Sequence, residues 1–406
     1  MSDTEDLEVG EARARLREAA PSPRRAPAPV ARDDAAGRVL ASAVRATDLA
    51  PREPRAIMDG YALAVVPGSP PADTWRVVGE SAAGHPMPRP LPTGGAARVS
   101  TGAVVPEGAT VVVAQEDTTR RGDELTLAEG TSLRSGRYIR PAGSDWSPGA
   151  TLLAAGTPLG PAELALLHAA GRARLEVFER PRVTIVSTGD ELVRDADDLR
   201  PGTVVSTNGT MLARLAERAG ASVQAQLDAS DDLSRVCETL DRACATSDIV
   251  LTSGGVSVGD HDHIHGALTH LGATRLFRRV RLRPGRPVTA ARVGDAMVLA
   301  LPGNPASSRV TFELLARVAI GHTAGRAHRH DDLQWVEAPL AGQLSSLRTR
   351  DLYARARWRD GALAPLARQG SGHLTSIADA DALILIPAGT PDVVDGSPVR
   401  ALLLPR

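Results

Sequence analysis

The chain has 406 residues, of which 42% are hydrophobic and 23% charged, as is typical of a soluble globular protein of about two to four domains. Its 47 basic residues nearly balance its 48 acidic residues, so the sequence lacks the basic excess of a nucleic-acid-binding protein. The aromatic content of 2% also leaves few rings on which bases could stack. A small anion held at one site is compatible with this composition.

All basic side chains are arginine, because the sequence contains no lysine. The two cysteines, Cys237 and Cys244, lie on the apolar side of a predicted helix, which is typical of buried packing rather than of a disulfide framework. The charged N-terminus lacks an apolar signal segment, and no run of about 18 apolar residues occurs. The sequence therefore favours a cytoplasmic protein without membrane contact.

The N-terminal part of the chain predicts a mostly helical, discontinuous domain. Residues 1–20 have the pattern of a short charged helix, which a proline-rich linker follows. Further helices are predicted at 33–43 and 161–170, the last of which begins with a proline. We assign residues 1–50 and 142–180 to this linker domain.

Two segments, residues 51–141 and 325–406, predict small β domains, because their short β-branched stretches are bounded by glycine, proline or aspartate. Residues 181–324 instead alternate predicted strands with helices that carry one apolar face. Such alternation predicts a mostly parallel sheet covered by helices on both faces. The predicted fold class is therefore multidomain, α/β plus β.

Three loops of the α/β segment follow predicted strands and carry glycine with polar residues. They read STGDEL at 187–192, TSGGVSVGD at 252–260 and LPGNP at 301–305. Ligands of parallel sheets bind outside the carboxyl ends of the strands. The three loops are therefore predicted to converge on one crevice.

The second of these loops extends to Asp262 and combines two chemistries. Its backbone at Gly254 and Gly255 can approach an oxyanion closely. Asp260 and Asp262 are hard oxygen ligands of the kind that suits a divalent cation. Turn formation and helix capping explain the same residues equally well when the loop is taken alone.

Carboxylates on separate elements favour a shared cation. Asp59 lies beside a glycine in MDGYA, and Asp190 and Glu191 lie in STGDEL. Gathered carboxylates repel one another unless a cation or a proton lies among them, which favours Mg²⁺. A Walker motif and a GxGxxG after a strand are both missing, so NTP hydrolysis and a Rossmann dehydrogenase are disfavoured.

Seven motifs occur in an order that resembles one known family. They are AIMDGYAL at 56–63, STGAVVPEGATVVVAQE at 100–116, GSDWSPG at 143–149, STGDEL at 187–192, TSGGVSVGDHD at 252–262, RPGRP at 283–287 and LPGNP at 301–305. The chain resembles the molybdopterin molybdenumtransferase family, which includes MoeA and the gephyrin E domain. The resemblance implies a central MoaB/MogA-like α/β domain, flanking small β domains of which the last is barrel-like, and the N-terminal linker domain.

The resemblance also implies a reaction and partners. Members of the family take adenylylated molybdopterin and molybdate, release AMP and leave molybdenum on the dithiolene, with help from Mg²⁺. A homodimer is implied, with the active site formed between subunits, and so is contact with the molybdopterin adenylyltransferase. Neither nucleic acid nor a membrane is an expected partner.

Site residues are carried over by match to the family motifs. The residues implied for catalysis are Asp59, Thr101, Glu191 and Asp262. Those implied for metal binding are Asp190, Glu191, Asp260 and Asp262. Those implied for substrate binding are Ser253, Gly254, Gly255, Ser257, Arg283, Arg286, Pro302, Asn304, Arg350 and Ser371. Asp145 also matches a family motif, and Asp228 matches more loosely.

Two of these residues fit the chemistry of molybdate. A tetrahedral dianion is best held by arginine, hydroxyl and amide groups, and Arg350 and Ser371 offer the first two. The chain departs from the family at Arg283 and Arg286, where lysines are usual. A planar guanidinium group therefore replaces a compact ammonium group at each position. Because lysine is missing throughout, we interpret this exchange as compositional drift that the site tolerates.

Two other functions stay open at this point. HDHIH at 261–265 carries imidazoles and a carboxylate that can bind Zn²⁺, as in a metal hydrolase, although its spacing does not put all three histidines on one helical face. A non-catalytic scaffold is the third possibility.

Overall fold

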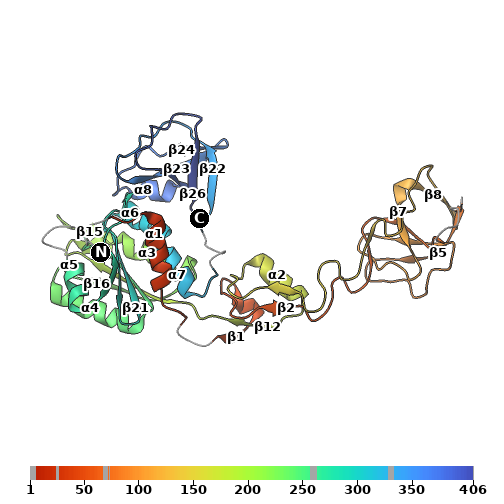
Figure 1. Cartoon of the computed structure of the whole chain (residues 1–406), viewed down its shortest axis with the longest axis horizontal. Coiled ribbons are helices and arrows are strands. Elements are labelled where there is room, and N and C mark those ends of the chain that lie inside the picture. The colour runs from red at the N-terminus through yellow and green to blue at the C-terminus, as the bar shows by residue number, and fades with distance from the viewer. Residues whose placement is uncertain are drawn as a thin grey trace. The chain divides into compact units, whose positions relative to one another are not determined.

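The computed structural model of the chain describes residues 6–23, 27–66, 72, 74–256, 263–327 and 333–405. The chain forms two compact units (Figure 1). The first contains residues 1–42, 155–165 and 173–406, and the second contains residues 43–154 and 166–172. No helix in the described part of the chain is long and apolar enough to span a membrane.

A six-stranded sheet forms the centre of the first unit. Its strands, in spatial order, are β16 (Ser222–Ala229), β13 (Arg182–Thr188), β17 (Ile249–Ser253), β21 (Ala296–Leu301), β20 (Thr289–Val293) and β18 (Thr274–Phe277). The pairings from β16 through β21 are parallel, whereas β20 and β18 add antiparallel pairings at one edge. The sheet is therefore mostly parallel, and the carboxyl ends of its four parallel strands lie at the same edge.

Helices cover both faces of this sheet. Successive residues of a strand point to opposite sides, so each strand contributes to two apolar cores. In β17, Ile249 and Leu251 belong to one apolar core, whereas Val250 belongs to the other. The first core includes α1 (Val9–Ala19), α3 (Thr207–Arg218), α6 (Pro305–Thr311), the π-helical turn η4 (Phe312–Ala316) and α7 (Arg317–Thr323). The second includes α4 (Leu233–Thr246) and α5 (His263–His270) on the opposite face (Figure 1).

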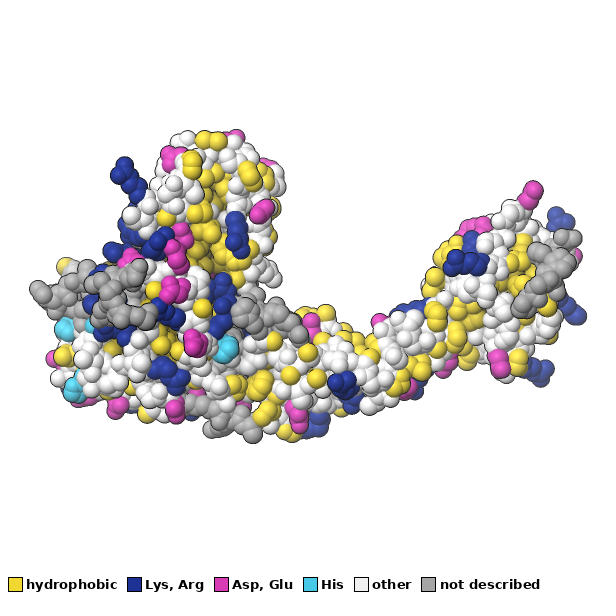
Figure 2. Space-filling model, viewed as in Figure 1, with side chains coloured by type: hydrophobic (Ala, Val, Ile, Leu, Met, Phe, Trp, Pro, Cys, Tyr) yellow, Lys and Arg dark blue, Asp and Glu magenta, His cyan; other side chains and the backbone are white. Residues whose placement is uncertain are grey.

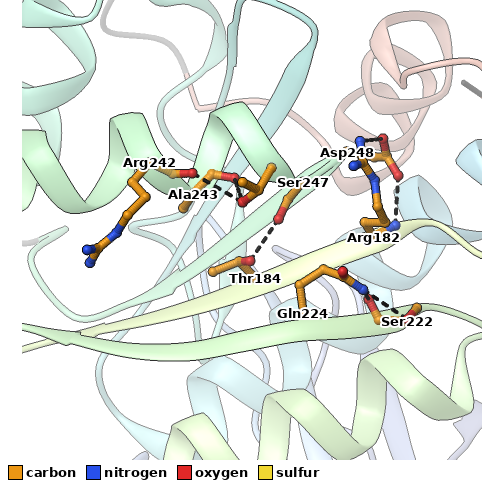
Figure 3. Close-up of polar contacts among 9 residues, drawn as sticks. Arg182, Thr184, Ser222, Gln224, Arg242, Ala243, Ser247 and Asp248 are labelled. Atoms are coloured by element: carbon orange, nitrogen blue, oxygen red, sulfur yellow. Dashed lines mark hydrogen bonds and ion pairs between the residues drawn. The ribbon is translucent and has the colours of Figure 1, made fainter.

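Buried polar contacts fix the register of β13 against β17 at their amino ends (Figure 3). Asp248, which is 5% exposed, accepts hydrogen bonds from the backbone N–H of Arg182 at 2.7 Å and from its guanidinium at 3.3 Å. The hydroxyls of Thr184 and Ser247 lie 2.7 Å apart in the same region. Satisfied polar groups at this depth strongly favour one register over its neighbours. They position the loops that leave the opposite ends of the two strands.

The C-terminal part of the first unit is a second six-stranded sheet with one short helix, α8 (Leu374–Asp379). Its strands are β19 (Leu282–Arg283), β23 (Asp351–Arg359), β25 (Ala382–Ile386), β26 (Pro398–Leu403), β22 (Trp335–Pro339) and, beside β23, β24 (Ala362–Pro365). A bridge between Leu340 and Leu363 brings the end of β22 to β24, so the sheet nearly closes on itself. The first strand, β19, comes from within the α/β segment, where it lies between β18 and β20 in the chain.

The N-terminal part differs from the mostly helical domain that the sequence predicts. It contains the pairs β1 (Ala28–Ala31) with β12 (Arg174–Val177) and β2 (Val44–Arg45) with β11 (Thr151–Leu153), besides α2 (Pro161–Ala169). The predicted helix at 33–43 is wrong, since only the 3₁₀ turn η1 (Arg32–Ala35) forms there. Gly37, with φ of +68°, ends that turn, and the next backbone groups pair with residues 157–159 instead.

The described residues of the second unit include a β domain of eight strands. They are β3 (Arg55–Ala56), β4 (Gly60–Leu63), β5 (Thr74–Ser81), β6 (Gly95–Val99), β7 (Val111–Ala114), β8 (Thr118–Arg121), β9 (Glu124–Leu127) and β10 (Ile139–Arg140). Six of them form one sheet in the order β7-β4-β6-β5-β9-β8, and β3 pairs with β10. On the face drawn in Figure 2, arginine and acidic side chains are interspersed on this domain and on the first unit.

Candidate functional site

A pocket of about 780 Å³ lies at the carboxyl ends of the parallel strands. The three predicted loops all contribute to it, through Glu191 after β13, Gly254 and Gly255 after β17, and Pro302 and Asn304 after β21. The side chain of Ser253, the last residue of β17, lines it as well. The structure therefore brings the described parts of the three loops to one crevice.

Glycine allows the loops to approach one another closely. Gly254 has φ of +99°, and a Cβ atom on it would lie 2.5 Å from the backbone oxygen of Thr188. Gly255 has φ of +63°, and a Cβ atom there would lie 3.0 Å from the hydroxyl of Thr188. A side chain at either position would push the β17 loop away from the β13 loop. The two glycines are needed for the shape of the pocket, whatever ligand it holds.

Asn208 connects two of the loops and was missed by the sequence analysis as a site residue. Its side chain is 9% exposed, and its amide nitrogen donates to the Ser253 hydroxyl at 2.8 Å and to the Gly303 carbonyl at 2.7 Å. It lies in the first turn of α3, together with Thr207, which also lines the pocket. The unpaired backbone N–H groups of a helix start favour an anion. The Ser-Thr-Asn sequence before an apolar helical pattern was the available signal.

Two carboxylates, Glu191 and Asp231, line this pocket. Asp231 was not predicted as a site residue, and it exchanges hydrogen bonds with Asp190. The Asp190 carboxylate accepts from the backbone N–H of Asp231 at 3.1 Å, and the Asp231 carboxylate accepts from that of Asp190 at 3.3 Å. Asp190 itself lines a separate cavity of about 240 Å³ with Asp228, which forms an ion pair with Arg194 at 2.7 Å. Asp190 and Asp228 thus each bind a residue of a neighbouring loop.

The predicted metal site is only partly covered by the structure. Ser257, Asp260 and Asp262 lie outside the described residues. Within the described ranges, no three histidine, cysteine or acidic side chains gather as a metal centre would require. The zinc alternative gains no support from HDHIH, because the Nε2 atom of His265 lies 3.1 Å from the Thr289 hydroxyl, and His261 lies outside those ranges.

A second pocket, of about 630 Å³, brings together the predicted oxyanion residues. Arg283 and Arg286 come from the loop around β19, and Arg350 and Ser371 come from the C-terminal domain. Within the part of the chain that the structure describes, the side chains of Arg283 and Arg350 form no hydrogen bond or ion pair. Their guanidinium groups are therefore available to a ligand.

Arg286 differs from the other two arginines because it already has an acidic partner. Its Nε and Nη2 atoms donate to the two carboxylate oxygens of Asp6 at 2.6 and 3.2 Å. This hydrogen bonding raises the pKa of Arg286 above its ordinary value. The guanidinium carries a full positive charge, but one of its hydrogen-bonding edges is occupied.

The two pockets adjoin one another. Pro287 lines both of them. The loop before α8 also contributes to both, through Gly370 and Ser371 in the smaller pocket and Gly372 in the larger. The carbonyl of Ser371 accepts a hydrogen bond from the backbone N–H of Ala306 at 2.9 Å, which ties this loop to the start of α6. A ligand that fills the larger pocket can therefore reach the arginine-lined pocket.

Asp59 and Thr101 form a close pair in the second compact unit. One carboxylate oxygen of Asp59 accepts from the backbone N–H of Thr101 at 2.6 Å and from its hydroxyl at 2.8 Å. These two hydrogen bonds hold the pKa of Asp59 below its ordinary value, because they stabilise the carboxylate. Asp145, in the same unit, pairs with Arg140 at 3.0 Å. Asp59 is therefore an exposed, ionised carboxylate at neutral pH.

Known proteins match this chain along most of its length. Three family models match in order: the MoeA N-terminal region (domain I and II) at residues 7–171, the probable molybdopterin binding domain at 184–322 and the MoeA C-terminal region (domain IV) at 337–404. The molybdopterin molybdenumtransferase of Nostoc sp. is 35% identical over 382 residues, which cover 91% of this chain and 87% of that relative. Molybdopterin molybdenumtransferase 2 of Mycobacterium tuberculosis is 32% identical over 388 residues, which cover 90% and 92%. The crystal structure of the molybdopterin biosynthesis moeA protein from Pyrococcus horikoshii superposes with a TM-score of 0.81 at 27% identity, covering 98% of this chain and all of that one.

The fold defines a multidomain α/β plus β protein with a pocket at the carboxyl ends of its parallel strands, where ligands of such sheets usually bind, and a second pocket beside it. The comparisons above also identify its family. The chain belongs to the molybdopterin molybdenumtransferase family, also named MoeA. It is a transferase with a role in molybdenum cofactor biosynthesis.

Proposed function

We propose that the protein transfers molybdenum from molybdate to adenylylated molybdopterin and releases AMP. The observation that carries this proposal is the contact between two different pockets. One is large and bounded by glycine loops and a helix start. The other is lined by three arginines, of which Arg283 and Arg350 have no side-chain partner among the described residues. A transferase that joins a bulky phosphorylated ligand to a small oxyanion needs such a pair of sites.

The larger pocket suits the phosphorylated, adenylylated ligand. Its volume of about 780 Å³ lies within the range of about 300–1,000 Å³ that is usual for small-molecule sites. The backbone N–H of Gly255 and the start of α3 at Thr207 present donors to this pocket, which favour phosphate oxygens. In our proposal Ser253, Pro302 and Asn304 complete the walls around the pterin or the nucleotide.

The smaller pocket suits molybdate. A tetrahedral dianion accepts hydrogen bonds from guanidinium and hydroxyl groups, which Arg283, Arg350 and Ser371 supply. Arginine binds with a rigid fork, so the angles of approach are more restricted than for the lysines usual in the family. We propose that Arg350 and Arg283 hold the oxyanion beside the ligand in the larger pocket.

Glu191 is the predicted catalytic acid that lines the larger pocket. We propose that it acts as a general acid or base when the phosphoanhydride bond breaks. The magnesium ion that the family resemblance implies would neutralise charge on that phosphoanhydride. In our proposal Asp260 and Asp262, which lie outside the described residues, complete the cation site with Asp190 and Glu191.

The reaction can be tested with purified full-length protein, adenylylated molybdopterin, Mg²⁺ and molybdate. We expect AMP to appear in a molybdate-dependent manner, measured by chromatography. Glu191→Ala should slow its release by about a hundredfold, since a positioned proton-transfer group contributes on this order. The surface change Glu217→Ala is the matched control and should have no effect. The absence of AMP above a protein-free blank would contradict the proposed function.

The oxyanion assignment can be tested in the same assay. Arg350→Ala should raise the molybdate concentration for half-maximal rate by about tenfold or more, because a charge-assisted hydrogen bond is lost. Arg348→Ala, on an exposed residue that does not line the pocket, is the control. If both variants require the same molybdate concentration as the unaltered protein, Arg350 does not bind molybdate.

A further inference from the structure

The N-terminal segment runs alongside the loop that carries the pocket arginines. Leu7, which is 8% exposed, forms a parallel bridge with Val280. Its backbone N–H donates to the Arg279 carbonyl at 3.1 Å, and its carbonyl accepts from the N–H of Arg281 at 2.8 Å. The two acidic neighbours of Leu7, Asp6 and Glu8, are thereby held next to this arginine-rich loop.

The two acids pair with different arginines. Asp6 binds Arg286 through both carboxylate oxygens, at 2.6 and 3.2 Å. Glu8 binds Arg281 at 2.7 Å. Arg286 lines the arginine pocket, whereas Arg281 does not. Of the two acids, it is therefore Asp6 that pairs with an arginine of the pocket.

The geometry of the Asp6 pair is that of an anion in a binding site. The carboxylate accepts hydrogen bonds from the Nε and Nη2 atoms of Arg286. The same pair of donors also fits two oxygens of a tetrahedral anion. The Asp6 side chain is only 14% exposed, so solvent screens its charge weakly. Arg283 and Arg350, by contrast, have no acidic partner within the described ranges, so Asp6 affects one pocket arginine selectively.

We propose that Asp6, although it does not line the arginine pocket, lowers the affinity of this pocket for oxyanions by competing for Arg286. This inference rests on the proposed function of the pocket as an oxyanion site. An incoming dianion must either displace the Asp6 carboxylate from Arg286 or bind beside a negative charge. Both routes cost free energy, and the second costs more for a dianion than for a monoanion, since Coulomb repulsion scales with charge.

The test is calorimetric titration of the full-length protein with tungstate, a tetrahedral dianion, and with perrhenate, a monoanion of the same shape. Asp6→Asn keeps the size of the side chain and removes its charge. We expect this variant to bind tungstate about tenfold more tightly, with a smaller gain for perrhenate. Glu8→Gln removes a charge from the same segment and should leave both affinities unchanged.

A double-mutant cycle separates competition at Arg286 from general electrostatics. In an Arg286→Gln background, Asp6→Asn should no longer strengthen tungstate binding, because the contested group is gone. Unchanged or weaker binding by Asp6→Asn, or an equal gain from Glu8→Gln, would overturn the inference. If the unaltered protein binds tungstate but Asp6→Asn changes nothing, the inference alone fails. If neither protein binds tungstate, the oxyanion assignment of the pocket fails with it.

Discussion

At the scale of single residues, Arg355 has the most unusual environment near the pockets. It lies in β23 at 1% exposure, and within the described ranges it has no acidic partner. Its Nη2 atom donates to the carbonyls of Arg368 and Gly370 at 3.0 and 2.9 Å, while Nε and Nη1 lack partners. Burial lowers its pKa, because a charged group is costly away from water. We infer that this cost is tolerated because Arg355 fixes the loop that carries Ser371.

Replacing Arg355 with methionine tests this role. The change removes two hydrogen bonds from the loop and one costly buried charge, so the melting temperature should stay close to that of the unaltered protein. Tungstate affinity should nevertheless fall by about tenfold, since Ser371 is no longer held in place. Calorimetric titration and thermal unfolding measure the two quantities. Arg359→Met, on an exposed arginine of the same strand, should change neither, and unaltered tungstate binding by Arg355→Met would refute the role.

At the scale of elements, the local sequence predicts which segments meet but not which side chains connect them. The convergence of the loops after β13, β17 and β21 follows from the alternation of strands and helices, because parallel strands share one edge. The link from Asn208 to Gly303 joins residues far apart in the chain, and so does the pair of Asp6 with Arg286. Such contacts depend on tertiary packing, which local periodicity does not specify.

The close approach of the β13 and β17 loops gives a prediction about Gly254. In Gly254→Ala, the new methyl group would lie 2.5 Å from the backbone oxygen of Thr188, in addition to the strain of a positive φ. Gly272→Ala is a control for the strain alone, since Gly272 has φ of +66° and no atom near its missing Cβ. We expect a loss of about 1 kcal/mol for the control and about 3 kcal/mol for Gly254→Ala, measured by urea unfolding. Equal losses would mean that the loops separate without cost.

At the scale of the whole molecule, the sequence predicted the α/β segment better than the N-terminal part. Apolar periodicity at 208–219 and 232–245 corresponds to α3 and α4, because those helices each bury one face against a sheet. The predicted helix at 33–43 failed, since backbone pairing with a segment more than 100 positions away replaced local hydrogen bonds. The family resemblance supplied the predicted catalytic roles of Asp59 and Thr101.

The homodimer implied by the family is a prediction about the whole molecule. Light scattering of the purified protein should give a mass of about twice the 42.4 kDa of the chain. Because a dimer is held by mass action, dilution should lower the apparent mass and the rate of AMP release together. A monomer that retains full activity at every concentration would contradict this expectation.

The short strand β19 has a consequence for how such a protein can be assembled from parts. Leu282 and Arg283 precede the boundary near residue 324 that the sequence indicates, yet they pair with Asp351 and Leu352 in the C-terminal sheet. The arginine pocket is divided in the same way, with Arg283 on one side of that boundary and Arg350 on the other. A chain cut or recombined there would split both the sheet and the pocket. The two domains therefore form one unit for the oxyanion binding that we propose, and neither can be exchanged without the other.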